Sequence, residues 1–292
     1  MLSYRHVFHA GNHADVLKHI VLQQTLLHLC QKEAPFFYID THAGAGAYAL
    51  NSDHAKKSGE SRDGIFRLLE AGNLPEAVQD YLRLIWAINP GKKLNRYPGS
   101  PCIAELLLRE QDRIRLFEMH PVDIRVLQDN IKLWAGLKTT PKPGRGRRII
   151  VERKDGFTSL KSLLPPPSRR AAVLIDPSYE VKQDYQSVIT TLVDAQKRFP
   201  TGTYMVWYPI LQRLESRRFA DQLKKNAARG WLNITLRIAR PVPDGTGFVA
   251  SGMFIINPPW KLREKLEEAM PSLVELLGRD DGAGYDIESG SV

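Results

Sequence analysis

The sequence contains few cysteines and no long apolar run. Of its 292 residues only two are cysteines, Cys30 and Cys102, and both lie in apolar patterns of helical spacing. We interpret them as buried thiols, because a disulfide framework needs more cysteines and an oxidising compartment. No apolar run reaches the roughly 18 residues of a membrane-spanning helix, and the first residues are too polar for a signal peptide. We therefore expect a cytoplasmic protein that does not enter a membrane.

Acidic residues are outnumbered by basic ones. The chain has 41 Lys and Arg against 32 Asp and Glu, a formal net charge of +9. The basic residues gather in three stretches, at 142–154, 169–170 and 213–229. Any one of these stretches could simply be a solvated surface. Together they favour a polyanionic partner such as a nucleic acid.

Seven apolar stretches predict the strands of an α/β fold: 35–40, 114–119, 148–153, 171–176, 203–210, 232–240 and 252–257. Helical patterns separate most of them, at 121–134, 156–164, 182–199 and 211–229. This alternation predicts a Rossmann-like, seven-stranded and mostly parallel sheet with helices on both faces. Only a short loop joins the last two stretches, so they should form a hairpin with an antiparallel last strand. We expect the tail from 278 onward to be loose.

One connection is too long for a single strand–helix unit. From Asp40 to Arg115 the chain advances 75 positions, and helical patterns at 60–71 and 75–88 fall inside this gap. A third helix, at 99–110, should lead back to the sheet. We predict a core of residues 1–49 and 97–292 with an inserted helical subdomain at 50–96.

The glycine-rich stretch YIDTHAGAGAYA follows the first expected strand and suggests a cofactor loop. Gly44, Gly46 and Ala49 fit the dinucleotide fingerprint, whereas Asp40 with Gly44 and Gly46 fits the first motif of S-adenosylmethionine enzymes. The dinucleotide interpretation needs a strand with a terminal acid soon afterwards, and the insertion stands there instead. We favour S-adenosylmethionine over NAD, with a purely structural turn as the third interpretation.

Acidic residues also end the next two expected strands. Glu118 closes the second, where a carboxylate can accept hydrogen bonds from both ribose hydroxyls. Asp155 and Gly156 follow the third, where an acid can bind the adenine amino group. Each acid alone is equally well explained as a turn or helix-cap residue. Three in succession strengthen the prediction of a nucleotide-like cofactor.

The stretch AAVLIDPSYE ends the fourth expected strand in Asp176-Pro177-Ser178-Tyr179. This tetrapeptide is close to the Asp-Pro-Pro-Tyr of many amino-group methyltransferases. An exocyclic base amine is a poor nucleophile, so a site must accept hydrogen bonds from both of its hydrogens. We expect Asp176 and the Pro177 carbonyl to accept them and Tyr179 to stack on a base turned out of its helix. The alternative is an ordinary strand–turn sequence.

A complete version of the same pattern, Asn257-Pro258-Pro259-Trp260, follows the last expected strand. Ligands of such sheets bind beyond the carboxyl ends of the parallel strands. Because the last strand should be antiparallel, Asn257 should lie at the opposite edge. We interpret this second tetrapeptide as a turn that ends the last strand and whose side chains pack into the core.

Four histidines crowd the amino-terminal segment: His6, His9, His13 and His19. Their spacing is not a standard ligand pattern and no cysteine is near, so we do not expect a metal site. Tyr4 and Lys18 suggest instead a segment that touches an anion or a base. A surface helix without such a role is the alternative.

The chain resembles the RlmJ family, the 23S ribosomal RNA adenine-N6 methyltransferases, over nearly its whole length. The resemblance rests on MLSYRH.FHAGNHADVLKH, DTHAGAG, YPGSP, DGF, LIDP.YE, GTY..WYP and SGM..INPPWKL. It implies transfer of one methyl group from S-adenosylmethionine to N6 of adenine 2030, in the usual rRNA numbering. We also expect a monomer that acts on naked or early-assembly rRNA. Ser178 departs from the family pattern, which has Pro there.

The resemblance also implies roles by position. The residues that would contact the cofactor are His19, His42, Ser100, Glu118, Asp155, Gly156 and Asp176, to which the glycine loop adds Gly44. Asp176 would also accept the proton, Tyr4 would contact the RNA, and Lys18 would support the same region.

Three other functions stay open on the residues alone. A DNA adenine-N6 methyltransferase would use the same site chemistry, since both nucleic acids favour a basic surface. A non-catalytic nucleic-acid-binding protein, linked to the use of external DNA, would need only the charge. An NAD oxidoreductase would need only the glycine loop.

Overall fold

The structure, a computed structural model, describes residues 6–50, 59–91, 93–137, 147–241 and 248–291, without the side chains of 135–137. Tyr4 and the basic residues Lys142 and Arg145 lie outside the described residues.

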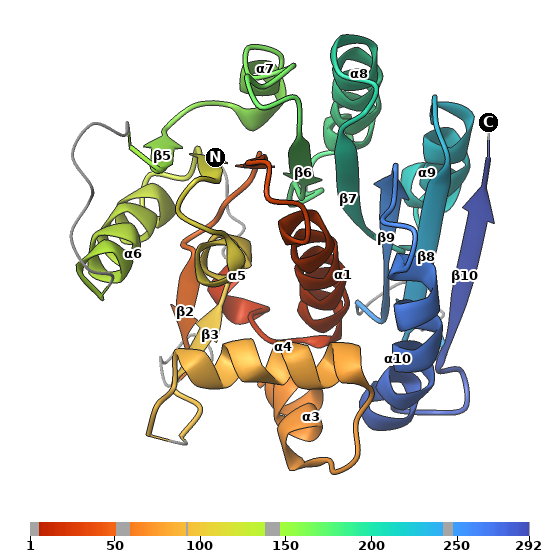
Figure 1. Cartoon of the computed structure of the whole chain (residues 1–292). Coiled ribbons are helices and arrows are strands. Elements are labelled where there is room, and N and C mark those ends of the chain that lie inside the picture. The colour runs from red at the N-terminus through yellow and green to blue at the C-terminus, as the bar shows by residue number, and fades with distance from the viewer. Residues whose placement is uncertain (1–5, 51–58, 92, 138–146, 242–247, 292) are drawn as a thin grey trace.

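An eight-stranded sheet is the frame of the described fold (Figure 1). Its strand order is β10-β8-β9-β7-β6-β1-β4-β5. In chain order these strands are β1 (Phe37–Asp40), β4 (Arg113–Phe117), β5 (Ile149–Glu152), β6 (Ala171–Ile175), β7 (Thr203–Pro209), β8 (Trp231–Arg237), β9 (Ala250–Ile256) and β10 (Gly284–Gly290). The five strands from β7 to β5 are parallel, while β9 is antiparallel to both β7 and β8. The predicted α/β class, the mostly parallel sheet and the hairpin are confirmed.

The tail departs from the prediction, because it forms the eighth strand. Strand β10 pairs antiparallel with β8 from Gly284 to Gly290, so the expected loose tail and the count of seven strands were wrong. Much of β10 is solvent-exposed, and its sequence, GYDIESG, lacks an apolar run. Backbone hydrogen bonds to an edge need no such run, which is why the apolar pattern did not reveal this strand.

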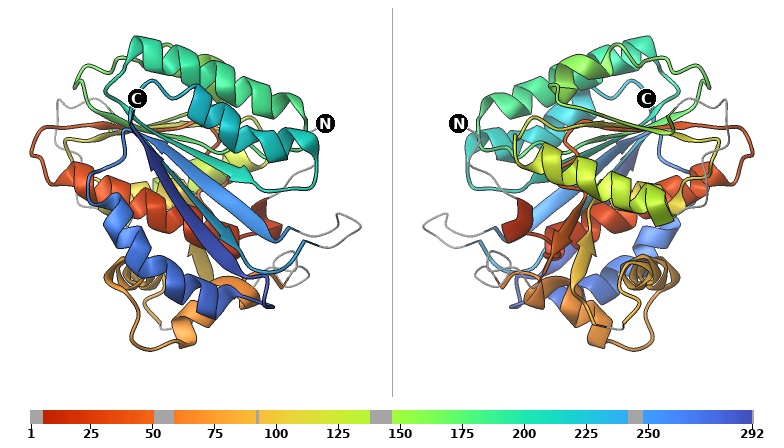
Figure 2. Two further views of the ribbon diagram at one scale, coloured as in Figure 1. Left: turned by 90° about the vertical axis from the view of Figure 1, so that its right-hand side faces the viewer. Right: turned by 90° about the vertical axis from the view of Figure 1, so that its left-hand side faces the viewer.

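Helices cover both faces of the sheet, and each face has its own buried cluster (Figure 2). One face carries α8 (Gln183–Arg198) and α9 (Leu214–Lys225), with the short α7 (Gly156–Leu160) beside α8. The other carries α1 (His13–Cys30), α5 (Ser100–Leu107) and α10 (Leu262–Leu277), and α6 (Asp123–Leu137) lies beside β5. In β6 the side chains of Ala172 and Leu174 belong to the α1 face and those of Val173 and Ile175 to the α8 face. A strand buried on both faces reads as one continuous apolar run.

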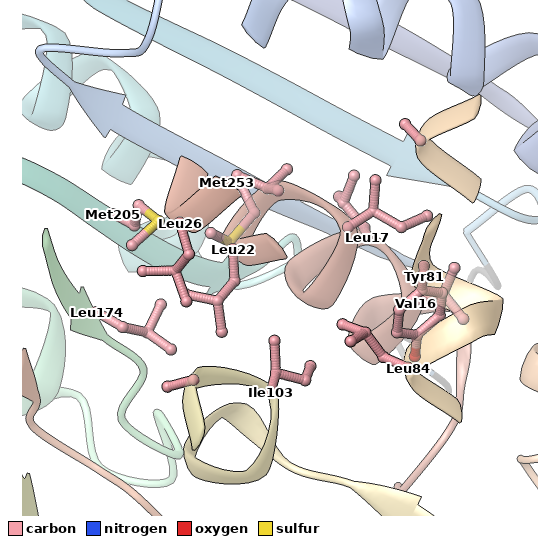
Figure 3. Close-up of a cluster of buried hydrophobic side chains, with 14 of the residues drawn as sticks. Val16, Leu17, Leu22, Leu26, Tyr81, Leu84, Ile103, Leu174, Met205 and Met253 are labelled. Atoms are coloured by element: carbon pink, nitrogen blue, oxygen red, sulfur yellow. The ribbon is translucent and has the colours of Figure 1, made fainter. Parts of the chain in front are cut away.

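Helix α1 is the centre of its face and is buried from His13 to Leu26. The Asn12 side chain caps it by accepting hydrogen bonds from the backbone N–H groups of Ala14 and Asp15, at 3.0 Å each. The close-up in Figure 3 shows Leu22 and Leu26 facing Met205 and Leu174 of the sheet. This burial excludes the surface helix that was the alternative for the amino-terminal segment.

The segment after the glycine loop contains the predicted helices and one feature that was not predicted. Its elements are the π-helical turn η2 (Arg62–Phe66), α3 (Arg67–Glu70) and α4 (Glu76–Ala87). Strands β2 (Ala47–Ala49) and β3 (Arg96–Pro98) pair antiparallel where this segment leaves and re-enters the core. Helix α4 crosses below α1 in Figure 1 and shares its buried cluster through Tyr81 and Leu84. The domain boundary at 50–96 stays a prediction.

No helix in the part of the chain that the structure describes is long and apolar enough to cross a membrane.

We predict that Leu22→Ala lowers the free energy of unfolding by about 2–5 kcal/mol, because it leaves a cavity between α1 and the sheet. Leu22 is fully buried, whereas Leu133 on α6 is 46% exposed. Leu133→Ala is the control and should change the stability by about 0.5 kcal/mol or less. Urea denaturation of both variants measures the difference, and equal losses would contradict the central position of α1.

Candidate active site

A cavity of about 340 Å³ lies beyond the carboxyl ends of the parallel strands. Its walls come from the ends of β1, β4, β6 and β7, from the start of α1 and from the starts of α5 and α7. The predicted site residues that the structure describes all line it: Lys18, His19, His42, Gly44, Ser100, Glu118, Asp155, Gly156, Asp176, Pro177 and Tyr179. Residues from distant parts of the sequence thus meet at the edge where such sheets bind ligands.

The glycine loop is tied to the end of β4 by a single carboxylate. The Gly44 N–H donates to Glu118 Oε2 at 2.7 Å, and the His120 N–H donates to Glu118 Oε1 at 2.6 Å. Gly44 has φ +59°, a conformation that favours glycine. Burial raises the pKa of Glu118, which these two backbone donors oppose. A carboxylate has about four acceptor positions, so Glu118 can still accept hydroxyl donors from the cavity.

Asp40, the acid that ends β1, has a structural position instead of lining the cavity. It is fully buried and accepts hydrogen bonds from Ser100 Oγ at 2.7 Å and from the Tyr38 hydroxyl at 2.8 Å. Burial raises its pKa to about 6. Through Ser100 it fixes the start of α5, which forms one wall of the cavity.

Asp155 caps α7, and Gly156 allows two parts of the backbone to meet. The Asp155 side chain accepts a hydrogen bond from the Phe157 N–H at 2.9 Å. A Cβ on residue 156 would collide with the carbonyl oxygen of Thr41, so only glycine fits there. The His42 ring contacts Phe157 edge-on at 4.7 Å between ring centroids. These contacts hold the end of β1 against the segment that follows β5.

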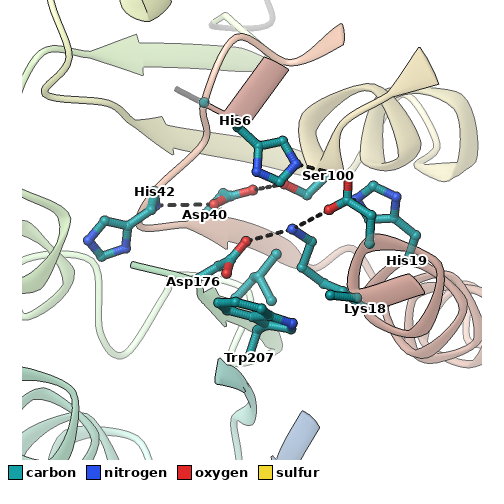
Figure 4. A network of polar contacts seen from close by, with 12 residues as sticks. His6, Lys18, His19, Asp40, His42, Ser100, Asp176 and Trp207 are labelled. Atoms are coloured by element: carbon teal, nitrogen blue, oxygen red, sulfur yellow. Dashed lines mark hydrogen bonds and ion pairs between the residues drawn. The ribbon is translucent and has the colours of Figure 1, made fainter. Parts of the chain in front are cut away.

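Asp176 is joined to α1 by a buried ion pair (Figure 4). Lys18 Nζ lies 2.8 Å from Asp176 Oδ2 and 2.8 Å from Asp15 Oδ1. Burial lowers the pKa of Lys18, but the two carboxylates outweigh this effect and hold it well above its usual value. For Asp176, burial raises the pKa more than Lys18 lowers it. The site thus holds a carboxylate of raised basicity beside a fixed cation.

The rest of the tetrapeptide forms the floor of the cavity. Tyr179 has φ +53° and is 1% exposed, and its hydroxyl donates to the Trp207 carbonyl at 2.7 Å. Arg213 Nη2, from a residue that also lines the cavity, donates to the Tyr179 carbonyl at 2.5 Å and so fixes the turn. The Tyr179 ring packs against Tyr185, with 4.7 Å between ring centroids. With so little of its surface exposed, Tyr179 offers no open face here, so its stacking on a base stays a prediction.

The second tetrapeptide lies at the opposite edge of the sheet, as predicted. The Asn257 side chain donates to the carbonyls of Pro200 and Gly202 at 2.8 and 2.7 Å, beside the start of β7. Asn257 therefore ends β9 and ties its end to the turn before β7. The expectation that the side chains of this turn pack into the core was wrong for Trp260, which is 75% exposed. The position of Asn257 follows from strand direction, because β9 is antiparallel to β6 and β7 and therefore ends at the other edge of the sheet.

The amino-terminal histidines have different surroundings. His6 Nε2 lies 2.9 Å from Asp15 Oδ2, and His9 Nδ1 lies 3.0 Å from Glu60 Oε2. His19 Nδ1 is 3.0 Å from the Tyr97 hydroxyl, and burial lowers its pKa to about 3. His13 packs against Phe248, with 5.0 Å between ring centroids. Within the described ranges no group of three or more His, Cys, Asp or Glu side chains could hold a metal ion.

Several residues of the site were missed by the sequence reasoning, and Asp15, Trp207 and Arg213 are the ones whose contacts fix the loop after β6 and the start of α1. Asp15 and Lys18 stand three positions apart, and this pair of charges within an apolar helical stretch was a usable signal. Trp207 borders the cavity, and its buried Nε1 has no hydrogen-bond partner among the described residues. Trp207 lies in the quoted motif GTY..WYP and Arg213 begins the basic stretch 213–229, but neither signal placed its side chain at the cavity, because that depends on contacts with the loop after β6.

The sheet order, with an antiparallel strand inserted beside β7 and a cavity over the parallel strand ends, is typical of the Rossmann-like class of S-adenosylmethionine-dependent methyltransferases.

Comparison with known proteins identifies the family. A family model described as "Ribosomal RNA large subunit methyltransferase D, RlmJ" matches residues 33–288. The ribosomal RNA large subunit methyltransferase J of Escherichia coli K12 is 46% identical over 273 residues, 94% of this chain and 93% of that protein. The protein of the same name from Haemophilus influenzae Rd is 44% identical over 289 residues, 99% of this chain and 98% of that protein. The chain belongs to the RlmJ family of methyltransferases.

A solved structure shows the same fold. The crystal structure of a protein from Legionella pneumophila strain Philadelphia 1 has a TM-score of 0.84 and 34% identity, and the match covers 97% of this chain and 99% of that one.

The cavity has features that suit S-adenosylmethionine. Glu118 has acceptor positions for hydroxyl groups, and Asp155 and Asp176 line the same cavity. The acceptors and the volume fit a nucleoside with an amino-acid extension, since small-molecule sites commonly enclose about 300–1,000 Å³. When bound, S-adenosylmethionine supplies a methyl group already activated by a sulfonium centre.

We predict that His19 makes the stability of the protein pH-dependent. Its folded-state pKa of about 3 lies below its ordinary value of 6.5, so between these values the unfolded chain binds the extra proton. Stability is then lost as the pH falls through 6.5, by about 2 kcal/mol between pH 7 and pH 5 from this group alone. His19→Gln should reduce that loss.

The measurement is urea denaturation at both pH values. His28→Gln is the control, because His28 lies at the end of the same helix and is only half-buried, whereas His19 is buried; burial lowers the pKa of His28 as well. A His19→Gln variant with the full wild-type pH dependence would disprove the neutral, buried state of His19.

Proposed function

We propose that the protein transfers one methyl group from S-adenosylmethionine to N6 of an adenine in 23S ribosomal RNA. The family and the names of the two methyltransferase J relatives support the RNA, and the resemblance of the whole chain points to adenine 2030. One observation carries the choice of reaction: Asp176-Pro177 stands at the carboxyl end of β6 in the same cavity as Glu118 and Asp155.

The chemistry at the amine follows from two acceptors. The lone pair of an exocyclic amine is delocalised into the base, and hydrogen bonds from both N–H groups shift the nitrogen towards a tetrahedral shape. Asp176 would accept one through its carboxylate and the Pro177 carbonyl would accept the other. Asp176 would also take the proton that the amine loses, a role that its raised pKa favours. The enzyme's remaining task is in-line alignment.

The cofactor would be held by residues from the ends of β1, β4 and β6, from the starts of α5 and α7, and from α1. Glu118 would accept the ribose hydroxyls, and Asp155 with Gly156 would contact the adenine. His42 and Gly44 would border it from the glycine loop. The remaining proposed contacts are His19, Ser100 and Asp176.

The proposed contacts with the RNA are less detailed than those with the cofactor. Tyr4 would contact the RNA, and it lies outside the described residues. Lys18 has a side chain 6% exposed between two carboxylates, which favours support of Asp176 over direct contact with phosphates. We further propose a cytoplasmic monomer that acts on naked or early-assembly rRNA through a core of 1–49 and 97–292 and a subdomain of 50–96.

The deciding experiment is transfer of labelled methyl groups to naked 23S rRNA, assembled large subunits and DNA, with the modified base mapped. Labelled N6-methyladenosine at one adenine of naked rRNA is the expected result. Label in DNA only would favour the DNA adenine methyltransferase, and no label in any substrate would favour a non-catalytic binding protein.

We predict that Glu118→Gln weakens binding of S-adenosylmethionine by about 10-fold or more. A hydrogen bond to a charged acceptor is worth about 1.5–3 kcal/mol, and Gln keeps the shape without the charge. Titration calorimetry measures the affinity. Glu110→Ala, an exposed acid outside the cavity, is the control and should bind like the wild type. Unchanged affinity of the Gln variant would remove Glu118 from the cofactor site.

We predict opposite results for the two tetrapeptides. Asp176→Ala should slow single-turnover methyl transfer by about 100- to 10,000-fold, because it removes an acceptor and the proton acceptor. Asn257→Ala should keep the transfer rate at saturating RNA but lose stability, since it deletes two hydrogen bonds. Thermal melts accompany both assays. Loss of transfer in folded Asn257→Ala, with activity kept in Asp176→Ala, would reverse the assignment.

A further inference from the structure

Two adjoining hollows lie at the amino ends of β6 and β7, at the edge of the sheet opposite the active site. They have volumes of about 350 and 280 Å³ and share His28, Leu29, Thr201 and Thr203. The first continues to Arg229, Asn257 and Trp260, and the second to Lys32, Arg169 and Arg170. The second tetrapeptide, to which the reaction gives no part, therefore forms a wall of this surface.

The linings of both hollows contain basic side chains and no acidic one. Lys32, Arg169 and Arg229 are exposed, and none of the three makes an ion pair with a carboxylate of the described residues. Burial lowers the pKa of His28, and the charges of Lys32 and Arg170 lower it further. The local potential is therefore positive, which favours a polyanion.

Trp260 is exposed although it is the largest apolar side chain of its turn. It is 75% exposed, more than any other large hydrophobic residue in the described ranges. Lys261 Nζ lies 4.8 Å from its ring centroid. Pro258 and Pro259 restrict the backbone before it, and the Asn257 amide fixes where the turn begins. The ring is thus held at the surface by a stiff turn without being buried in the core.

We propose that this surface, formed by His28, Lys32, Arg169, Arg229, Trp260 and Lys261 and here called the amino-edge platform, docks a second segment of the RNA substrate. An unpaired base would stack on Trp260 while the cations contact flanking phosphates, the combination by which single-stranded nucleic acids are held. The proposal rests on the proposed function and adds to it how the large substrate is recognised away from the reacting adenine.

The distance between the two sites sets the kind of substrate that can use both. Strand β7 has seven residues, from Thr203 at the amino-edge platform to Pro209 at the cavity, which corresponds to about 23 Å. An oligonucleotide of two or three nucleotides that fills the cavity is too short to reach Trp260 as well, since a strand in a duplex advances about 3.4 Å per nucleotide. A folded RNA domain can, so the amino-edge platform should affect long substrates only.

The first experiment compares Trp260→Ala with the wild type on a 23S rRNA domain and on a short oligonucleotide that carries the target adenine. Stacking on an aromatic side chain is worth about 1–3 kcal/mol per base, so the KM and the Kd for the long RNA should rise about 5- to 150-fold. The kcat, the affinity for S-adenosylmethionine and the short-substrate kinetics should not change. Trp260→Phe should restore most of the binding.

Trp86→Ala is the matched control, because Trp86 is 37% exposed on α4 and lines neither hollow. It should bind the long RNA like the wild type. Wild-type affinity of Trp260→Ala for the long RNA would overturn the proposal, as would an equal loss in Trp86→Ala. A wild-type enzyme that methylates no RNA would instead overturn the proposed function.

The second experiment tests the cations. Arg169→Ala/Arg229→Ala should weaken long-RNA binding and reduce the slope of log Kd against log salt by about 1.4–1.8, since each lost phosphate contact removes about 0.7–0.9. Arg83→Ala/Lys132→Ala removes the same charge from side chains that are 64% and 77% exposed elsewhere. An equal effect of both pairs would mean that only net charge matters. Loss of binding to a polyglutamate probe alone would assign the surface to an acidic protein; either result overturns the proposal.

Discussion

The buried ion pair between Lys18 and Asp176 is the constraint on which the arrangement of the site depends. An unpaired charge in a protein interior costs several kcal/mol, so Lys18 of α1 must meet carboxylates wherever the helix packs. Asp15 lies one turn earlier on α1, and Asp176 stands at the end of β6. Because Lys18 contacts both carboxylates, the start of α1 is fixed over the carboxyl ends of the strands. The same contact orients the carboxylate beside the glycine loop.

The direction of a strand decides what its terminal turn can do. Asp176-Pro177 and Asn257-Pro258 are similar pairs, and each follows a buried apolar strand. Because β6 is parallel and β9 antiparallel, the first pair reaches the cofactor cavity and the second reaches the opposite edge. There the proline turn presents Trp260 to solvent among basic residues. One sheet thus separates a reaction centre from a surface suited to binding nucleic acid.

Much of the fold could be predicted because its strands are buried on both faces. Such strands form near-continuous apolar runs, as in β6 and β9, and the seven predicted stretches correspond to the strands from β1 to β9 other than β2 and β3. Strands β2, β3 and β10 escaped prediction, since short or exposed pairs are stabilised by backbone hydrogen bonds that leave little trace in the side-chain pattern. The burial of α1 escaped as well, because its charged residues suggested solvent until their partners were known.

The sequence by itself determined the local chemistry: the glycine loop, an acid at the end of each of three strands, and an Asp-Pro turn after the fourth. These are properties of neighbouring residues, so they can be recognised without a fold. The tertiary structure alone decided that Asp40 is an internal anchor, that Tyr179 is buried and that Trp260 is exposed. It also brought Lys18 to Asp176, 158 positions along the chain. Such pairings depend on which surfaces are buried against each other, and only the tertiary structure specifies that.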